Sequence, residues 1–105
     1  MGSQRYQDVA ADDVLSRFQR GEKLIIVDVR QPDEYAAGHI PGAILIPLPN
    51  LEDYLDQLDK ETEIFLVCRS GVRSRTAAKI LAEKGFRQVR NISGGMLAWK
   101  GPVER

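Results

Sequence analysis

The residues best suited to chemistry lie in one short stretch, FLVCRSGVRSR, from Phe65 to Arg75. It contains Cys68, the only cysteine of the 105-residue chain, at the end of an apolar run and directly before polar and basic residues. A cysteine thiolate is a strong nucleophile, whereas a thiol enclosed in apolar surroundings is inert. The residues around Cys68 therefore decide between a reactive cysteine and a structural one.

The residues that follow Cys68 favour the thiolate. If a buried strand ends here and a helix begins at Ser74, then Arg69 to Arg73 form a tight loop whose backbone N–H groups can converge on an anion. Gly71 supplies the positive φ that such a turn requires, and the loop is basic with no acidic residue. We predict that Cys68 is the catalytic nucleophile; the alternative is a buried, inert cysteine at the end of a core strand. The predicted substrate- or persulfide-binding loop consists of Arg69, Ser70, Gly71, Val72, Arg73 and Ser74.

The spacing between the cysteine and the arginine bears on which anion this loop accepts. Cysteine phosphatases and arsenate reductases use Cys-x5-Arg, in which the arginine holds a tetrahedral oxyanion through two hydrogen bonds. Here Arg73 follows Cys68 after four intervening residues, and Ser74 occupies the place of that arginine. The shorter loop favours a smaller group, such as one sulfur atom carried on the cysteine as a persulfide. The phosphatase or arsenate reductase function remains an alternative, because the Arg75 side chain could turn inward.

The elements that must position this loop alternate between strand and helix patterns. Two nearly continuous apolar runs are typical of strands buried on both faces of a parallel sheet, and weaker strand patterns lie elsewhere. The strand patterns are KLIIVDV (23–29), AILI (43–46), EIFLVC (63–68) and QVRNI (88–92), with another at RYQDVA (5–10); the helical patterns are AADDVLSRFQRG (10–21), NLEDYLDQLDK (50–60) with Asn50 as a capping residue, and SRTAAKILAEKG (74–85). This alternation predicts an α/β layer fold, in which ligands bind at the carboxyl ends of the strands, where Cys68 lies.

Charge and composition exclude several classes of function. Fifteen Lys and Arg balance fifteen Asp and Glu, so we expect no nucleic-acid partner and no membrane partner. No apolar run reaches the roughly 18 residues of a membrane span, and the N-terminus has no apolar signal segment, which favours a cytoplasmic protein. One cysteine and one histidine make neither an internal disulfide nor a structural zinc site, so we expect no metal and no cofactor.

Three separated segments resemble one known family. CRSGVRS resembles the active-site loop of rhodanese-like sulfurtransferases, VDVRQPDEYAAGHIPGAILIPL is similar to the N-terminal signature of that family, and ISGGMLAWKGPV is similar to its C-terminal segment. Together they imply a single rhodanese domain over residues 1–105, with residues 1–4 as a cloning remnant or a disordered end. The resemblance also implies a three-layer α/β fold with about five mostly parallel strands flanked by helices.

The resemblance implies a function as well. Cys68 would accept a sulfane sulfur from thiosulfate, another small anionic donor or a persulfide, and would pass it to an external thiol, cyanide or protein. The candidate supporting residues are Asp28, Arg30 and Arg75; we expect Asp28 and Arg30 to hydrogen-bond, or to pair with Glu34, and so to fix the turn after their strand. His39 is expected to pack rather than to act as a base. Outside the enzymes, the alternative is a thiol-sensing or docking module that catalyses nothing.

Overall fold

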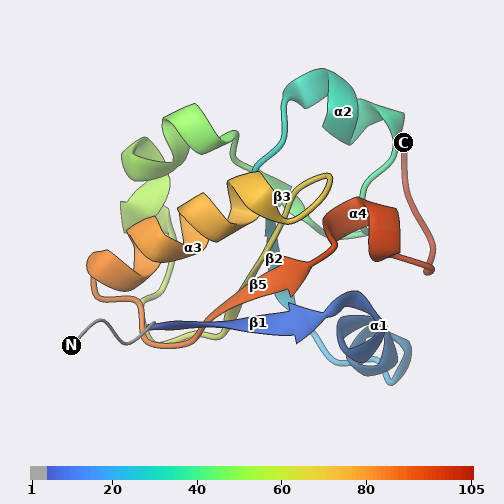
Figure 1. The fold of residues 1–105 in the computed structure, drawn as a ribbon, viewed down its shortest axis with the longest axis horizontal. Helices are drawn as coiled ribbons and strands as arrows, with labels where there is room; N and C mark the ends of the chain where they lie inside the picture. Colours follow the sequence, from blue (N-terminus) through green and yellow to red (C-terminus); the bar gives the residue numbers. More distant parts are fainter. Residues whose placement is uncertain (1–4) are drawn as a thin grey trace.

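Five parallel strands form the central sheet of the structure, a computed structural model that describes residues 5–105 (Figure 1). The strands are β1 (Tyr6–Ala10), β2 (Ile25–Asp28), β3 (Ile44–Leu45), β4 (Ile64–Val67) and β5 (Val89–Ser93), in the spatial order β1-β5-β4-β2-β3. Every neighbouring pair is parallel, so the carboxyl ends of all five strands lie at the same edge. The expected α/β class is confirmed, with a sheet that is entirely parallel rather than mostly so.

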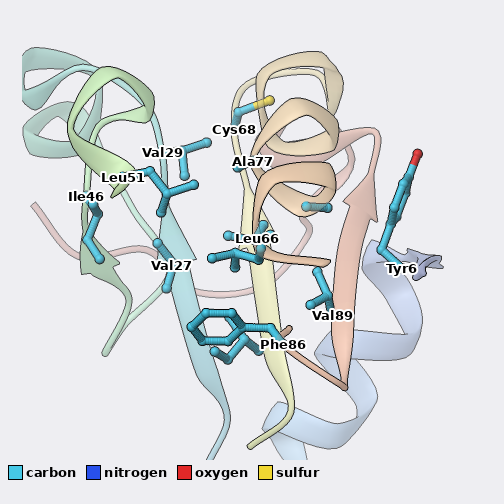
Figure 2. Close-up of a cluster of buried hydrophobic side chains, with 13 residues drawn as sticks. Tyr6, Val27, Val29, Ile46, Leu51, Leu66, Cys68, Ala77, Phe86 and Val89 are labelled. Carbon is cyan, nitrogen blue, oxygen red and sulfur yellow. The ribbon is translucent and has the colours of Figure 1, made fainter. Parts of the chain in front are cut away.

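Helices cover both faces of this sheet. They are α1 (Ala11–Gln19), α2 (Pro32–Ala37), the 3-10 helix η1 (Leu48–Gln57), α3 (Val72–Glu83) and α4 (Gly95–Ala98). Side chains along β4 alternate between the faces, as successive residues of a strand do. Leu66 belongs to the cluster that includes Leu81 of α3 (Figure 2), whereas Phe65 belongs to the cluster that includes Val14 of α1. The three-layer arrangement follows from these two buried clusters.

Two predicted helix starts are wrong. The third helix begins at Val72 instead of Ser74, with Gly71 as its N-cap in the left-handed conformation at φ 102°. That conformation lets the helix begin directly after Gly71. The connecting loop expected over residues 69–73 is therefore shorter, and Val72 and Arg73 belong to the first helical turn. The helical segment η1 begins at Leu48, directly after a proline, so Asn50 lies inside the helix and does not cap it.

The predicted remnant or disordered end, residues 1–4, lies outside the described residues. Within residues 5–105, no helix combines the length and the apolar content needed to cross a bilayer.

Candidate active site

Cys68 follows β4 at the carboxyl edge of the sheet. Its side chain is buried, with 1% of the residue exposed, and it lies at the upper end of the cluster of Figure 2 with its sulfur pointing away from the rest of that cluster. The strand that precedes it is buried at all four positions. A fully buried strand also holds the residue that directly follows it, so the position of the sulfur is set by the packing of the sheet.

Backbone amides at the start of α3 converge on the sulfur of Cys68. The N–H of Gly71 donates to Sγ at 3.1 Å and the N–H of Ser74 donates to it at 3.3 Å. Burial raises the pKa of the Cys68 thiol, but the polar groups around the sulfur, namely the Ser74 side chain and the amides of Ser74, Gly71 and Ser70, outweigh it, so the pKa is lowered below its ordinary value. The start of the helix therefore favours the thiolate, as the loop sequence predicts.

The guanidinium of Arg73 is paired with a carboxylate. Its Nη1 and Nη2 donate to the two oxygens of Glu34 at 2.7 and 2.9 Å, which makes a bidentate ion pair between α3 and α2. The hydrogen bonds from Arg73 and from the Gln31 amide lower the pKa of Glu34 to about 2. The guanidinium fork that would hold a tetrahedral oxyanion is thus already occupied.

Of the two arrangements expected for Asp28 and Arg30, the structure shows the hydrogen bond between them and no pairing of Arg30 with Glu34. Arg30 donates through Nε and Nη2 to the carboxylate of Asp28, with Nη2 to Oδ2 at 2.8 Å, and also to the carbonyl of Gly38 at 2.8 Å. Both side chains of this ion pair are almost fully buried. The other carboxylate, Glu34, pairs instead with Arg73 of α3. Asp28 and Arg30 therefore tie the end of β2 to the chain after α2, as expected of residues that fix a turn.

A second layer of contacts lies behind the two donating amides. The Ser74 hydroxyl donates to Asn91 Oδ1 at 2.6 Å, and Asn91 Nδ2 donates to Asp8 at 2.9 Å and to the carbonyl of Gly71 at 3.5 Å. Asn91, on β5, thus contacts both residues whose amides reach Cys68 Sγ. Ser74 and Asn91 are buried, and this chain of hydrogen bonds satisfies their polar atoms.

The turn from β5 into α4 supports the same loop from the other side. The amide of Met96 donates to the carbonyl of Cys68 at 2.8 Å, and the amide of Leu97 donates to that of Arg69 at 3.0 Å. Gly95, at φ 55°, lies so close that a Cβ there would collide with the Cys68 carbonyl oxygen and stand 2.6 Å from that of Arg69. A side chain at position 95 would displace the loop.

The other predicted residues lie apart from the sulfur or at the surface. Arg69 and Arg75 are exposed, and neither pairs with a carboxylate within residues 5–105. His39 stacks on Tyr35 with ring centroids 3.6 Å apart, and its Nδ1 lies 2.8 Å from the Tyr35 carbonyl oxygen. These contacts give His39 the packing role expected of it.

Three contributors to the site were missing from the sequence interpretation: Glu34 as the partner of Arg73, Asn91, and Gly95. An asparagine inside the strand pattern QVRNI and a Gly-Gly pair one residue after that pattern were signals for the last two. Glu34 offered none, because it is one of several acidic residues in its segment and lies 39 positions from its partner.

Fold and site together define an α/β protein with a buried cysteine in a cradle of backbone amides. The sequence matches the rhodanese-like domain over residues 10–102. It is 37% identical over 98 residues to YtwF of Bacillus subtilis (strain 168), covering 93% of this chain and 94% of that one. It is also 37% identical over 79 residues, 75% of each chain, to the thiosulfate sulfurtransferase GlpE of Pseudoalteromonas translucida (strain TAC 125).

A solved structure agrees with these matches. The rhodanese-like domain protein of Staphylococcus aureus superposes with a TM-score of 0.86 at 34% identity, covering 93% of this chain and 96% of that one. The chain therefore belongs to the rhodanese-like domain family, and its relatives include sulfurtransferases.

Proposed function

We propose that this protein is a sulfurtransferase that moves a sulfane sulfur through a persulfide on Cys68. The observation that carries the proposal is the pair of amides, from Gly71 and Ser74, that donate to Cys68 Sγ. Such donors stabilise the attacking thiolate and the negative charge that the sulfur group keeps after transfer. Family membership supports the same class of reaction.

The proposed reaction has two displacement steps. The Cys68 thiolate attacks the outer sulfur of thiosulfate; the sulfur–sulfur bond of the donor breaks, a new bond to Sγ forms, and sulfite leaves with the bonding electrons. An external thiolate, cyanide or protein cysteine then attacks the terminal sulfur, which returns Cys68 to its thiolate form. The acceptor must come from outside, because the chain has no second cysteine. Thiosulfate is our first candidate donor because one of the relatives is a thiosulfate sulfurtransferase.

Each segment of the loop has a role in this proposal. Residues 69–74 form the cradle, and the exposed guanidinium of Arg69, which has no carboxylate partner within residues 5–105, attracts the anionic donor. Arg75, on the exposed side of the first turns of α3, adds to that attraction. Asp28 and Arg30 act through structure, by fixing the turn that leads to Glu34.

The proposal also places the protein in the cytoplasm as one domain that needs no metal or cofactor.

Two features weigh against the phosphatase or arsenate reductase alternative. The loop is one residue shorter than Cys-x5-Arg. Glu34 also occupies both donor positions of the Arg73 fork, which an oxyanion would need. A phosphate would have to displace a carboxylate that already makes two hydrogen bonds.

Mass spectrometry of the intact protein tests the proposal. After incubation with thiosulfate, the wild-type protein is expected to gain one sulfur atom that cyanide removes, while the matched Cys68→Ser variant gains none. Parallel rates of thiocyanate formation and of aryl phosphate hydrolysis separate the two enzymes. Efficient phosphate hydrolysis without any gain of sulfur would make the phosphatase the better assignment. Absence of both activities would favour a non-catalytic module.

A further inference from the structure

The two most exposed large hydrophobic side chains of residues 5–105 border the Cys68 loop. Val72 is 64% exposed and Leu97 is 66% exposed. Val72 follows Gly71, whose amide donates to Cys68 Sγ, and Leu97 donates its own amide to the carbonyl of Arg69. These side chains lie at the start of α3 and on α4, the two elements that meet at this loop (Figure 1).

The same surface carries positive charge that nothing on the described chain neutralises. Arg69 and Arg75 are exposed and have no carboxylate partner within residues 5–105, whereas Arg73 between them is paired with Glu34. Val72 and Arg75 lie three residues apart in α3 and therefore on one side of the helix. We call the surface formed by Arg69, Val72, Arg75 and Leu97 the active-site face.

A small anionic donor accounts for the arginines of this surface but not for its exposed hydrophobic side chains. Thiosulfate is attracted by arginines and amides, but it gains nothing from exposed valine and leucine side chains. Large exposed hydrophobic side chains next to a site commonly mark contact with a protein, in which they become buried. The combination of apolar and cationic side chains fits a partner surface that is apolar and acidic.

We infer that the active-site face docks a protein acceptor that presents its cysteine among apolar and acidic side chains. This inference rests on the proposed function and names the acceptor class. Cys68 is 1% exposed, so the acceptor cysteine must stand on a protruding segment that reaches into the loop. Its thiolate attacks the terminal sulfur of the Cys68 persulfide; the sulfur–sulfur bond at Cys68 breaks, one forms on the acceptor, and Cys68 leaves as the thiolate, so charge and atoms balance.

Synthetic peptides with a single cysteine test the partner chemistry. One peptide has leucine and aspartate on each side of the cysteine; one matched peptide replaces the leucines with serines, and another replaces the aspartates with lysines. The protein is first charged with sulfur from thiosulfate, and kcat/KM for transfer to each peptide is measured by mass spectrometry. We expect the first peptide to be better than each of the others by about tenfold. High salt should reduce its advantage over the lysine peptide.

Variants locate the contact on the protein. Leu97→Ser is expected to lower transfer to the leucine peptide several-fold and to leave thiosulfate-to-cyanide turnover unchanged, while Leu97→Met retains both. The control is Ile44→Ser, because Ile44 is also exposed, at 44%. Its side chain lines a different place, a cavity of about 200 Å³ formed with Ile64, the first residue of β4, and with residues that precede β4 in the sequence. Ile44→Ser should change neither reaction.

The outcomes separate this inference from the function on which it rests. Equal rates for the three peptides, or equal effects of Leu97→Ser and Ile44→Ser on peptide transfer, would overturn the docking inference while thiocyanate formation stays normal. Failure of the wild-type protein to form thiocyanate at all would remove the proposed function and the docking inference with it.

Discussion

The Ser74 hydroxyl donates a 2.6 Å hydrogen bond to the side-chain oxygen of Asn91. Asp8 fixes the orientation of Asn91, because its carboxylate accepts at 2.9 Å and only the amide nitrogen can donate to it. A hydroxyl has one proton, so while Ser74 donates to Asn91 it does not donate to the sulfur of Cys68. The Asp8–Asn91 pair thus competes with Cys68 for the proton that helps to lower the pKa of its thiol.

Asp8→Asn is expected to lower the pKa of Cys68 further. The Asn91 side chain is then free to turn and to release the Ser74 hydroxyl toward the sulfur, and one negative charge is removed as well; both changes favour the thiolate. We expect the midpoint of the pH dependence of iodoacetamide alkylation to fall by about half a unit or more. Asp13→Asn, an exposed position on α1, is the control and should leave the midpoint in place. A midpoint that rises in Asp8→Asn would show that Asp8 helps the thiolate instead.

Cys68→Ser is expected to abolish sulfur transfer and to keep the fold. A smaller oxygen replaces the sulfur without overpacking the site, and the amides of Gly71 and Ser74 still have an acceptor, so the free energy of unfolding should change by no more than about 1 kcal/mol. Turnover should fall at least about a thousandfold, because a serine hydroxyl is not ionised at neutral pH. Thiocyanate formation and urea unfolding measure the two effects. Turnover near that of the wild type would refute the persulfide mechanism.

Glu34→Gln is expected to remove part of the acid sensitivity of the fold. The pKa of Glu34 is depressed from its ordinary range to about 2 by Arg73, so this pair stabilises the folded state above the ordinary pKa and loses its effect as the pH falls toward 2. The variant should be less stable than the wild type at pH 7 by about 1 to 2 kcal/mol, a value reduced from the full shift because the pair is partly exposed. Near pH 2 the two proteins should be almost equally stable.

Urea unfolding at both pH values measures this difference. The matched control is Glu52→Gln, because Glu52 forms only an exposed 3.5 Å pair with Lys84. A stability difference between Glu34→Gln and the wild type that is the same at pH 7 and near pH 2 would mean that the ion pair contributes nothing to the pH dependence.

The sequence predicted those parts of the site that depend on neighbours along the chain. Cys68, Gly71 and Ser74 lie within seven residues, so a strand, a glycine turn and a helix start were enough to expect amides around the sulfur. It failed for Asn91 and Asp8, which are 83 residues apart. Their contact requires β1 to lie beside β5 with Asp8 opposite Asn91, and that register is set by packing of the whole sheet.

The same reasoning explains the errors at the helix starts. Asn50 is a good capping residue by type, but the prolines on either side of Leu48 have φ values already suited to a helix, and η1 begins there instead. The expected start of α3 at Ser74 relied on the arginines belonging to the loop. Gly71 in the left-handed conformation lets the helix begin directly after it, which brings the Ser74 amide within reach of Cys68.

Gly95→Ala is expected to disturb the Cys68 loop more than its backbone conformation alone predicts. The new Cβ would collide with the carbonyl oxygen of Cys68 and crowd that of Arg69. Gly42→Ala is a matched control, because Gly42 also has a positive φ, 85°, but nothing lies within 4 Å of its Cβ position. We expect Gly95→Ala to lose about 1 to 3 kcal/mol more stability than Gly42→Ala and most of its sulfur transfer. Equal losses of stability in the two variants would mean that the positive φ alone, and not the close contact with the loop, destabilises Gly95→Ala.

Inserting one small residue between Gly71 and Val72 tests the loop length that favours sulfur over phosphate. The insertion gives Cys-x5-Arg spacing with Arg73 as the arginine. In the present structure the amides of Gly71 and Ser74 both reach Cys68 Sγ, and an added residue between them breaks this convergence. Thiocyanate formation should fall about tenfold or more. A one-residue insertion after Gly21, in the exposed turn that follows α1, should have little effect.

The larger loop should also bind phosphate or arsenate more tightly, and the gain should be greater when Glu34→Gln is added. Glu34 holds both donors of the Arg73 fork, so the insertion alone leaves the arginine occupied, whereas the double variant frees it for an oxyanion. Phosphate inhibition constants for the wild type, each single change and the combination measure this dependence. Catalysis of phosphate hydrolysis is not expected, because the loop of residues 69–74 contains no acidic residue to protonate the leaving group. If the native protein already hydrolyses aryl phosphates efficiently and the insertion leaves sulfur transfer unchanged, loop length does not select the substrate and the phosphatase becomes the better assignment.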